Sequence, residues 1–219
     1  QMAVTPPDEG VVTMAANAAY RLIEGEDKQQ IKMLLFATES GIDQSKSAGI
    51  FVHQLLGLSK QCRVVELKQA CYSATVGIRM ALNHIKCNPD EKVLVIASDI
   101  ARYGLNTGGE SSQGGGAVAM LLSANPRLVS IEDATGICVE DAMDFWRPNY
   151  RDEALVDGKL SCALYLKLLK ETWKDYSANS NNSYGDIQHF CYHTPLPSLA
   201  EKAHHKLAIN NNRRGVSKE

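Results

Sequence analysis

Short apolar runs alternate with stretches of helical periodicity over the first 122 residues. In the helical stretches, apolar residues recur every three or four positions, as in amphipathic helices. The run KVLVIA at 92–97 is short and β-branched, which is typical of a strand buried on both faces. This alternation predicts an α/β layered fold with helices on both faces of a sheet. The expected helices are 11–23, 45–56 and 72–85, and the expected strands are 33–37, 62–66, 92–97 and 117–122.

The pattern changes after residue 123, where polar and aromatic residues without a clear period become common. A long stretch of this kind is typical of a functional loop. The expected elements are a strand at 128–131, a loop at 135–159, a helix at 161–176, a strand at 187–193 and a short helix at 199–207. We therefore divide the chain into an N-terminal part, 1–125, and a second part, 126–219, which begins with the loop region.

Composition narrows the function classes. The 219 residues carry a formal net charge of −2, and 44 % of them are hydrophobic, so a packed core is expected. No long basic stripe is present, which argues against nucleic acid as the main partner. No apolar run approaches the roughly 20 residues of a membrane-spanning helix, and no signal peptide is visible. The six cysteines show no C-x-x-C pair, which favours reduced thiols and a cytoplasmic location.

Cys71 is the strongest candidate for a reactive side chain. It follows an apolar run and precedes a helical stretch, so it lies at a turn from a strand into a helix. Unpaired N–H groups at a helix N-terminus favour the thiolate, which is the nucleophilic form of cysteine. The alternative is a small buried hydrophobic residue. Glu39 and His193 also end apolar runs, and this shared position favours one site containing all three residues.

Two other patterns invite different interpretations. The glycine-rich stretch 104–116 lacks the G-x-x-x-x-G-K-[ST] phosphate motif and leads into a strand, so a structural role that allows close backbone approach is favoured over phosphate binding. Cys191 and His193 are two residues apart, and no second pair of metal-ligand residues with matching spacing is present, so no metal is expected.

Asp99 ends the clearest strand, on the side where sites of open α/β sheets collect.

A cysteine, a histidine and a separate glutamate favour acyl transfer through a thioester. A cysteine protease would also use a Cys–His pair with an orienting third residue. However, the protease signatures Q-A-C-[RQG]-G and C-G-[SA]-C-[WY] are both absent around Cys71.

Six motifs, in order along the chain, closely resemble the 3-hydroxy-3-methylglutaryl-CoA synthase family. They are ATESGID at 37–43, KQACYSAT at 68–75, ARYGLNTGGE at 101–110, AMDFWRP at 142–148, LVDGKLS at 155–161 and CYHTP at 191–195. The resemblance runs from about residue 11 to 207 and looks closest to the bacterial enzymes of the mevalonate pathway. It implies a thiolase-like α-β-α-β-α fold of two related halves, usually a homodimer. The family's additional N-terminal elements and later active-site Asn motif have no counterpart here, so the fold is expected to be incomplete at both ends.

The resemblance also implies roles for individual residues. Cys71 matches the nucleophile that accepts acetyl from acetyl-CoA, Glu39 the general acid/base, and His193 the residue on the acetoacetyl-CoA side. Asp99 and Asp144 match acids that support the active site. The family forms a carbon–carbon bond to give 3-hydroxy-3-methylglutaryl-CoA, and it uses CoA thioesters as substrates without a bound cofactor.

Substrate contacts leave alternatives open. Lys202 matches a family lysine near the CoA phosphates and Thr107 lies in a matched motif, so both are expected to bind substrate. A second family lysine is replaced by Ser198, which favours, as the runner-up, a polyketide β-branching synthase acting on carrier-protein thioesters. An inactive fragment that serves as a dimerisation or binding module is the third interpretation.

Overall fold

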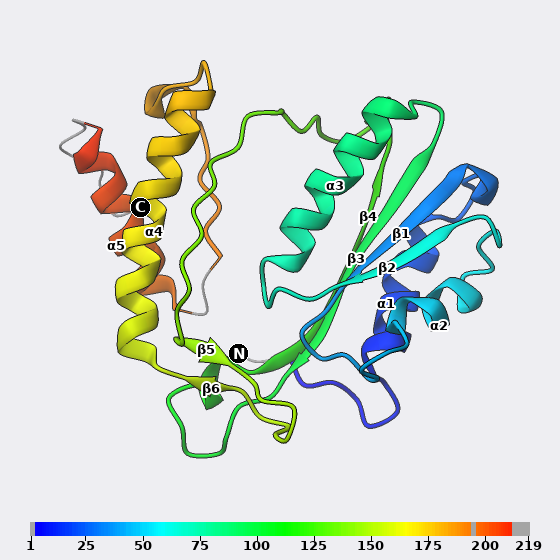
Figure 1. Cartoon of the computed structure of the whole chain (residues 1–219), viewed down its shortest axis with the longest axis horizontal. Coiled ribbons are helices and arrows are strands. Elements are labelled where there is room, and N and C mark those ends of the chain that lie inside the picture. Colours follow the sequence, from blue (N-terminus) through cyan, green and yellow to red (C-terminus); the bar gives the residue numbers. More distant parts are fainter. Residues whose placement is uncertain (1–2, 194–195, 212–219) are drawn as a thin grey trace. The chain divides into compact units, whose positions relative to one another are not determined.

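The computed structural model describes residues 3–193 and 196–211 (Figure 1). The chain forms two compact units. The first comprises Gln1–Ala101 and Gln113–Ser130, and the second comprises Arg102–Ser112 and Ile131–Glu219. The loop Arg102–Ser112 therefore belongs to the second unit although it connects two strands of the first. None of the helices in the described ranges is both long and apolar enough to cross a membrane.

The first unit is built around one mixed β-sheet. Its elements are α1 (Val11–Leu22), η1 (Lys28–Gln30), β1 (Ile31–Ala37), α2 (Ala48–Leu55), β2 (Arg63–Leu67), α3 (Ser73–Cys87), β3 (Lys92–Ala101) and β4 (Gly114–Leu122). The strand order is β2-β1-β3-β4. β1 pairs in parallel with β2 and β3, and β4 runs antiparallel to β3. The parallel strands need long crossovers, which α2 and α3 provide.

Helices cover both faces of this sheet, as the sequence pattern predicted (Figure 1). Side chains alternate between the two faces along a strand. Leu34 and Phe36 of β1 accordingly pack in one cluster with residues of α1 and α2, whereas Leu35 packs in another with residues of α3. All three are fully buried. The layered α/β architecture is therefore confirmed.

The helices and strands predicted for the first unit all form, and their ends differ most from the prediction in β3 and β4. β3 continues to Ala101 rather than ending at residue 97, and β4 begins at Gly114 rather than at residue 117. Glycine lets the N-terminal segment lie close to the start of β4, because a Cβ at Gly115 would overlap the side chain of Thr5, and the Gly115 amide donates to the Ala3 carbonyl at 2.9 Å. Close backbone approach is thus the role of at least this glycine. Asp99 consequently lies inside β3, opposite Gly116, and not at a strand end.

The second unit contains two long helices that pack together, α4 (Gly158–Asn179) and α5 (Pro197–Asn210). Leu164 of α4 and Leu207 of α5 are buried. The Trp173 indole on α4 donates a hydrogen bond to Oδ1 of Asn211 at 3.2 Å. The remaining elements are η2 (Glu110–Ser112), β5 (Phe145–Trp146), β6 (Leu155–Val156) and η3 (Tyr184–Asp186). β5 and β6 form an antiparallel pair within the stretch that was predicted to be a loop.

Two predicted strands do not form. Residues 128–131 and 187–193 are irregular in the structure. A strand requires a partner for its backbone N–H and C=O groups, and neither segment pairs with another strand in the described part of the chain. Apolar alternation therefore predicted an extended segment at 187–193 but could not supply the pairing that defines a strand.

The contact between α2 and the sheet gives a test of the packing. A Cβ at Gly49 would lie 2.9 Å from both Phe36 Cβ and Val64 Cγ1, so Gly49→Ala forces α2 away from the sheet. We expect a loss of about 1–3 kcal/mol in the free energy of unfolding, measured by urea denaturation and circular dichroism. Gly158→Ala, which meets no atom within 4 Å, is the matched control and should change stability by less than about 0.5 kcal/mol. Equal stability of both variants would contradict the close helix–sheet contact.

Candidate active site

The carboxylate of Asp99 organises the turn that follows β1. Its Oδ1 accepts hydrogen bonds from the Thr38 hydroxyl at 2.8 Å, from the Glu39 amide at 2.7 Å and from the Ser40 amide at 3.0 Å. Asp99 belongs to β3, the neighbour of β1 in the sheet. One carboxylate oxygen on one strand thus binds a hydroxyl and two backbone amides of three residues that follow the next strand.

A second set of contacts holds the same turn from its far side. The Ser40 hydroxyl donates to the Ile100 carbonyl and accepts from the Ile100 amide, each at 3.1 Å. Thr38 and Ser40 are therefore both attached to β3, on either side of Glu39. The Glu39 side chain is partly buried. Its place is set by backbone anchoring and does not depend on a flexible loop.

Cys71 lies in a tight turn immediately before α3. Ala70 has φ of +43°, a left-handed conformation that costs energy for a residue with a Cβ. The buried Ser73 hydroxyl accepts from the Gln69 amide at 2.6 Å and donates to the Ala70 carbonyl at 3.0 Å, which braces the turn. Strained backbone of this kind is common at functional sites. The turn places Cys71 one residue before Tyr72, the N-cap of α3.

The surroundings of Cys71 favour the thiol and not the thiolate. Although Cys71 keeps an exposed surface, desolvation, the negative charge of Glu39 and that of Asp99, in this order, raise the pKa of the thiol to about 11. The net shift is therefore opposite to the one expected from a helix N-terminus. Desolvation and two nearby carboxylates outweigh a backbone hydrogen bond that lowers the pKa.

Three of the predicted site residues are thus gathered in the first unit. Glu39 and Asp99 lie close enough to Cys71 for their charges to act on its pKa. One oxygen of Asp99 is occupied by three donors, which suits a structural role for this acid. A nucleophile held as a thiol beside a carboxylate can take part in acyl transfer and in proton removal from a bound acyl group.

The other predicted residues belong to the second unit. His193 is exposed and ends the extended segment 187–193. Asp144 is partly buried just before β5, and its carbonyl accepts from the Asp157 amide at 2.8 Å. Thr107 is exposed, and its hydroxyl donates to the Gly104 carbonyl at 2.6 Å, within its own loop.

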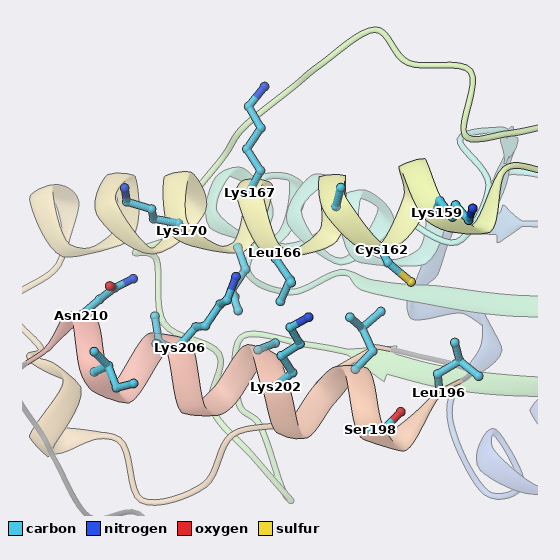
Figure 2. A pocket seen from close by; sticks show the side chains of 16 residues that line it. Lys159, Cys162, Leu166, Lys167, Lys170, Leu196, Ser198, Lys202, Lys206 and Asn210 are labelled. Carbon is cyan, nitrogen blue, oxygen red and sulfur yellow. The ribbon is translucent and has the colours of Figure 1, made fainter.

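A groove lies between α4 and α5, and we call it the α4–α5 groove (Figure 2). Its volume is about 920 Å³, and both Ser198 and Lys202 line it. Figure 2 shows Lys202 and Lys206 extending from α5 toward α4. Lysines of α4 also line the groove, and among them Lys167 pairs with Glu140 at 2.6 Å. Lys202 and Lys206 therefore place positive charge in the groove, which suits an anionic ligand.

Some residues of the site were not found by the sequence analysis. Ser73, Thr38 and Ser40 carry the hydrogen bonds that shape the two turns. Polar residues flanking a strand end or a helix start are a weak signal for such roles, because many turns contain them. Across residues 3–193 and 196–211, no group of three or more His, Cys, Asp or Glu side chains is placed to hold a metal ion.

Comparison with known proteins identifies the same family as the six sequence motifs. Residues 7–124 match the family model of the N-terminal domain of chalcone and stilbene synthases, and residues 129–219 match that of the C-terminal part of hydroxymethylglutaryl-coenzyme A synthase. The hydroxymethylglutaryl-CoA synthase of Enterococcus faecalis is 42 % identical over 93 % of this chain and 53 % of its own length. The polyketide 3-hydroxy-3-methylglutaryl-ACP synthase PksG of Bacillus subtilis is 38 % identical over the same shares. The chain spans about half the length of these curated relatives.

Solved structures show the same relationship. An HMG-CoA synthase complexed with CoA has a TM-score of 0.90 and 45 % identity, with 94 % of this chain and 53 % of that chain covered. The HMG synthase of the curacin pathway, in complex with an acetyl donor-ACP, has a TM-score of 0.92 and 35 % identity, with 98 % and 55 % covered. The likeness in fold, in sequence and in the ordered motifs leads to one conclusion: the chain belongs to the hydroxymethylglutaryl-CoA synthase family and has its thiolase-like fold.

Proposed function

We propose that the protein is a hydroxymethylglutaryl-CoA synthase, an acyltransferase that condenses acetyl-CoA with acetoacetyl-CoA to give 3-hydroxy-3-methylglutaryl-CoA and CoA in the mevalonate pathway. The observation that carries the proposal is the grouping of Cys71 with Glu39 in the first unit, where the carboxylate charge raises the pKa of the thiol. This pair suits both halves of the reaction, which need a nucleophile and a base.

In the first step the Cys71 sulfur attacks the carbonyl carbon of acetyl-CoA. The bond from that carbon to the CoA sulfur breaks, and the thiol proton ends on the departing CoA. Cys71 now carries the acetyl group as a thioester and is neutral. Because the acetylated sulfur can no longer ionise, it cannot form a thiolate that would be repelled by the Glu39 carboxylate.

In the second step Glu39 removes a proton from the methyl group of the acetyl thioester. The enolate carbon then attacks the ketone carbon of acetoacetyl-CoA, and the ketone oxygen becomes a hydroxyl by taking up a proton. A carboxylate held next to the acetyl thioester can serve as the general base for this step. Water finally cleaves the Cys71 thioester, which releases the product and restores the thiol.

His193 and Asp144 are proposed to serve the acetoacetyl-CoA side of this reaction. A neutral or charged imidazole can donate a hydrogen bond to the oxygen on which charge develops. The support for His193 is its place in the matched CYHTP motif and its exposed side chain, which a substrate can reach. For Asp144 the support is the matched motif alone. Asp99 is proposed to hold the turn that carries Glu39.

Lys202 and Thr107 are proposed to contact the substrate. The cationic α4–α5 groove supports the assignment of Lys202 to the CoA phosphates, since phosphate recognition uses lysine as a compact charge. The groove also contains Ser198, so the lost family lysine would have stood beside Lys202. Thr107 is supported by its matched motif, while its hydroxyl is occupied within the loop.

The runner-up function is a polyketide β-branching synthase that acts on carrier-protein thioesters. Ser198 favours it, because a carrier-bound substrate brings its own protein surface and needs fewer phosphate contacts. Relatives of this kind are also similar to the chain, as the Bacillus subtilis synthase shows. The higher identity to the Enterococcus faecalis enzyme and the retained Lys202 favour CoA thioesters.

The proposal extends to assembly and location. Both substrates are already activated as thioesters, so the reaction needs no bound cofactor. We propose a homodimer because the family resemblance implies one. A cytoplasmic location is supported by the six cysteines, all of which are free thiols in the structure.

Cys71 should become acetylated when the protein is incubated with acetyl-CoA, because it is the thiol placed beside Glu39 in a strained turn. Peptide mass spectrometry should find the added acetyl group on Cys71, and Cys71→Ala and Cys71→Ser should lose it. Cys191→Ala is the control and should be acetylated normally. Acetyl on Cys62 or Cys191 would contradict the assignment, and no acetylation at all would favour the inactive binding module.

Glu39→Gln should separate the two halves of the reaction. Removing a negative charge lowers the pKa of Cys71 from about 11, so alkylation by iodoacetamide should begin at lower pH, while the exposed Cys87 serves as the reference thiol. Acetylation of Cys71 should persist, whereas condensation should fall by about 100-fold to 10,000-fold because the base is lost. If this variant condenses the substrates at the unmodified rate, Glu39 is not the base. If the variant loses acetylation of Cys71, Glu39 instead activates the thiol.

Ser198→Lys should tighten acyl-CoA binding by about twofold to fivefold at low salt, because it restores a cation beside Lys202. The gain should fade at high salt, and Lys202→Ala should weaken binding. Lys174→Ala, on α4 but outside the groove, should have no effect. Binding is measured by calorimetry with acetoacetyl-CoA. If neither groove variant changes binding while a carrier-bound acetoacetyl group is turned over faster than acetoacetyl-CoA, the polyketide function is favoured.

A further inference from the structure

The extended segment 187–193 shows two different sides. Phe190 and Tyr192 are partly buried, whereas Cys191 and His193 between and after them are exposed. This is the alternation of an extended chain, in which neighbouring side chains point to opposite sides. Since the segment pairs with no strand in the described residues, its orientation depends on what Phe190 and Tyr192 contact.

Phe190 belongs to an aromatic cluster formed with the two helices and η3. Its ring lies 6.2 Å from that of Trp173 on α4, 5.1 Å from that of Tyr184 in a stacked arrangement, and 5.2 Å edge-on from the His204 ring on α5. Such contacts are favourable but not strongly directional, because rings can slide over one another at similar distances. They hold the segment against the helices without fixing its register.

Tyr192 makes the directional contact. Its ring lies parallel to that of Phe190, 6.2 Å away, and its hydroxyl forms a hydrogen bond with Nδ1 of His204 at 3.0 Å. Burial raises the pKa of the Tyr192 phenol to about 12, so the phenol keeps its proton at neutral pH and can donate it. With the phenol as the donor, this hydrogen bond requires a free lone pair on Nδ1 of His204, which corresponds to the tautomer with hydrogen on Nε2.

We propose that Tyr192 and His204 are positioning residues for His193, whose direction they set through the hydrogen bond between the segment and α5. In an extended chain a slip of one residue exchanges the two sides, so it would turn His193 toward the helices. The bond at Tyr192, directly before His193, prevents this slip. The inference rests on the proposed function, because His193 acts on acetoacetyl-CoA there, and a misplaced catalytic group costs rate steeply.

The first test does not depend on activity. In protein labelled with ¹⁵N-histidine, NMR should show His204 as the Nε2–H tautomer with an unprotonated Nδ1. Tyr192→Phe keeps the ring and removes the hydroxyl, so it should abolish this preference and also shift the His193 resonances. Tyr184→Phe, in the same aromatic cluster, should leave both unchanged. If the His193 resonances are the same in Tyr192→Phe as in the unmodified protein, the proposal is overturned, even if the tautomer of His204 changes.

The second test separates positioning from simple stability. Tyr192→Phe and His204→Leu should each lower kcat for condensation by about threefold to tenfold, while acetylation of Cys71 by acetyl-CoA keeps its rate. His204→Gln retains a hydrogen-bond acceptor and should therefore keep most of the original kcat. His205 is exposed, and His205→Gln should leave kcat unchanged. Equal loss of acetylation and condensation, or no advantage of His204→Gln over His204→Leu, would overturn the proposal. If the protein shows no condensation, the proposed function fails while the NMR result still decides the positioning.

Discussion

A single carboxylate oxygen, Oδ1 of Asp99, has the largest influence on the candidate site. It gathers one hydroxyl and two amides from the residues after β1, which converts a strand end into a defined turn. Hydrogen bonds to a charged acceptor are stronger than those between neutral groups, and three of them on one atom leave the turn little freedom. The location of Glu39 depends on this arrangement, and so does the distance at which its charge acts on Cys71.

The same arrangement creates an electrostatic conflict. Asp99 and Glu39 both place negative charge near Cys71, and the thiol is partly desolvated although the residue keeps an exposed surface. The site is therefore organised around an uncharged sulfur. Such a site is better suited to a neutral thioester than to a standing thiolate, since acylation removes the ionisable group altogether. The strain at Ala70 and the brace from Ser73 keep the sulfur in this environment in spite of its cost.

The periodicity of the sequence was sufficient to predict the first unit, because each of its strands is an apolar run and each helix has one apolar side. The predictions were wrong where pairing decides the structure. Residues 187–193 have the composition of a strand but no partner in the described chain, whereas β3 continues past Asp99 because residues 114–116 pair with it in antiparallel fashion. The positions of three residues in the sequence were enough to select them as neighbours, namely Cys71, Glu39 and Asp99. The direction in which the Cys71 pKa shifts could not be predicted in this way. It depends on the charges and the burial around the thiol in three dimensions, which no local sequence pattern contains.

The raised pKa of Cys71 also couples the thiol to the integrity of the fold. In an unfolded chain the thiol has its ordinary pKa of 9.0, against about 11 in the native state. Folding therefore favours the proton on sulfur, and this contribution to stability is complete below pH 9 and is lost as the pH rises toward 11. At neutral pH, molecules in which the turn has opened expose far more thiolate than native ones do. Oxidants and electrophiles should thus react with Cys71 faster in copies whose turn has opened than in native ones, so that the two nearby carboxylates protect the thiol chemically in the folded state.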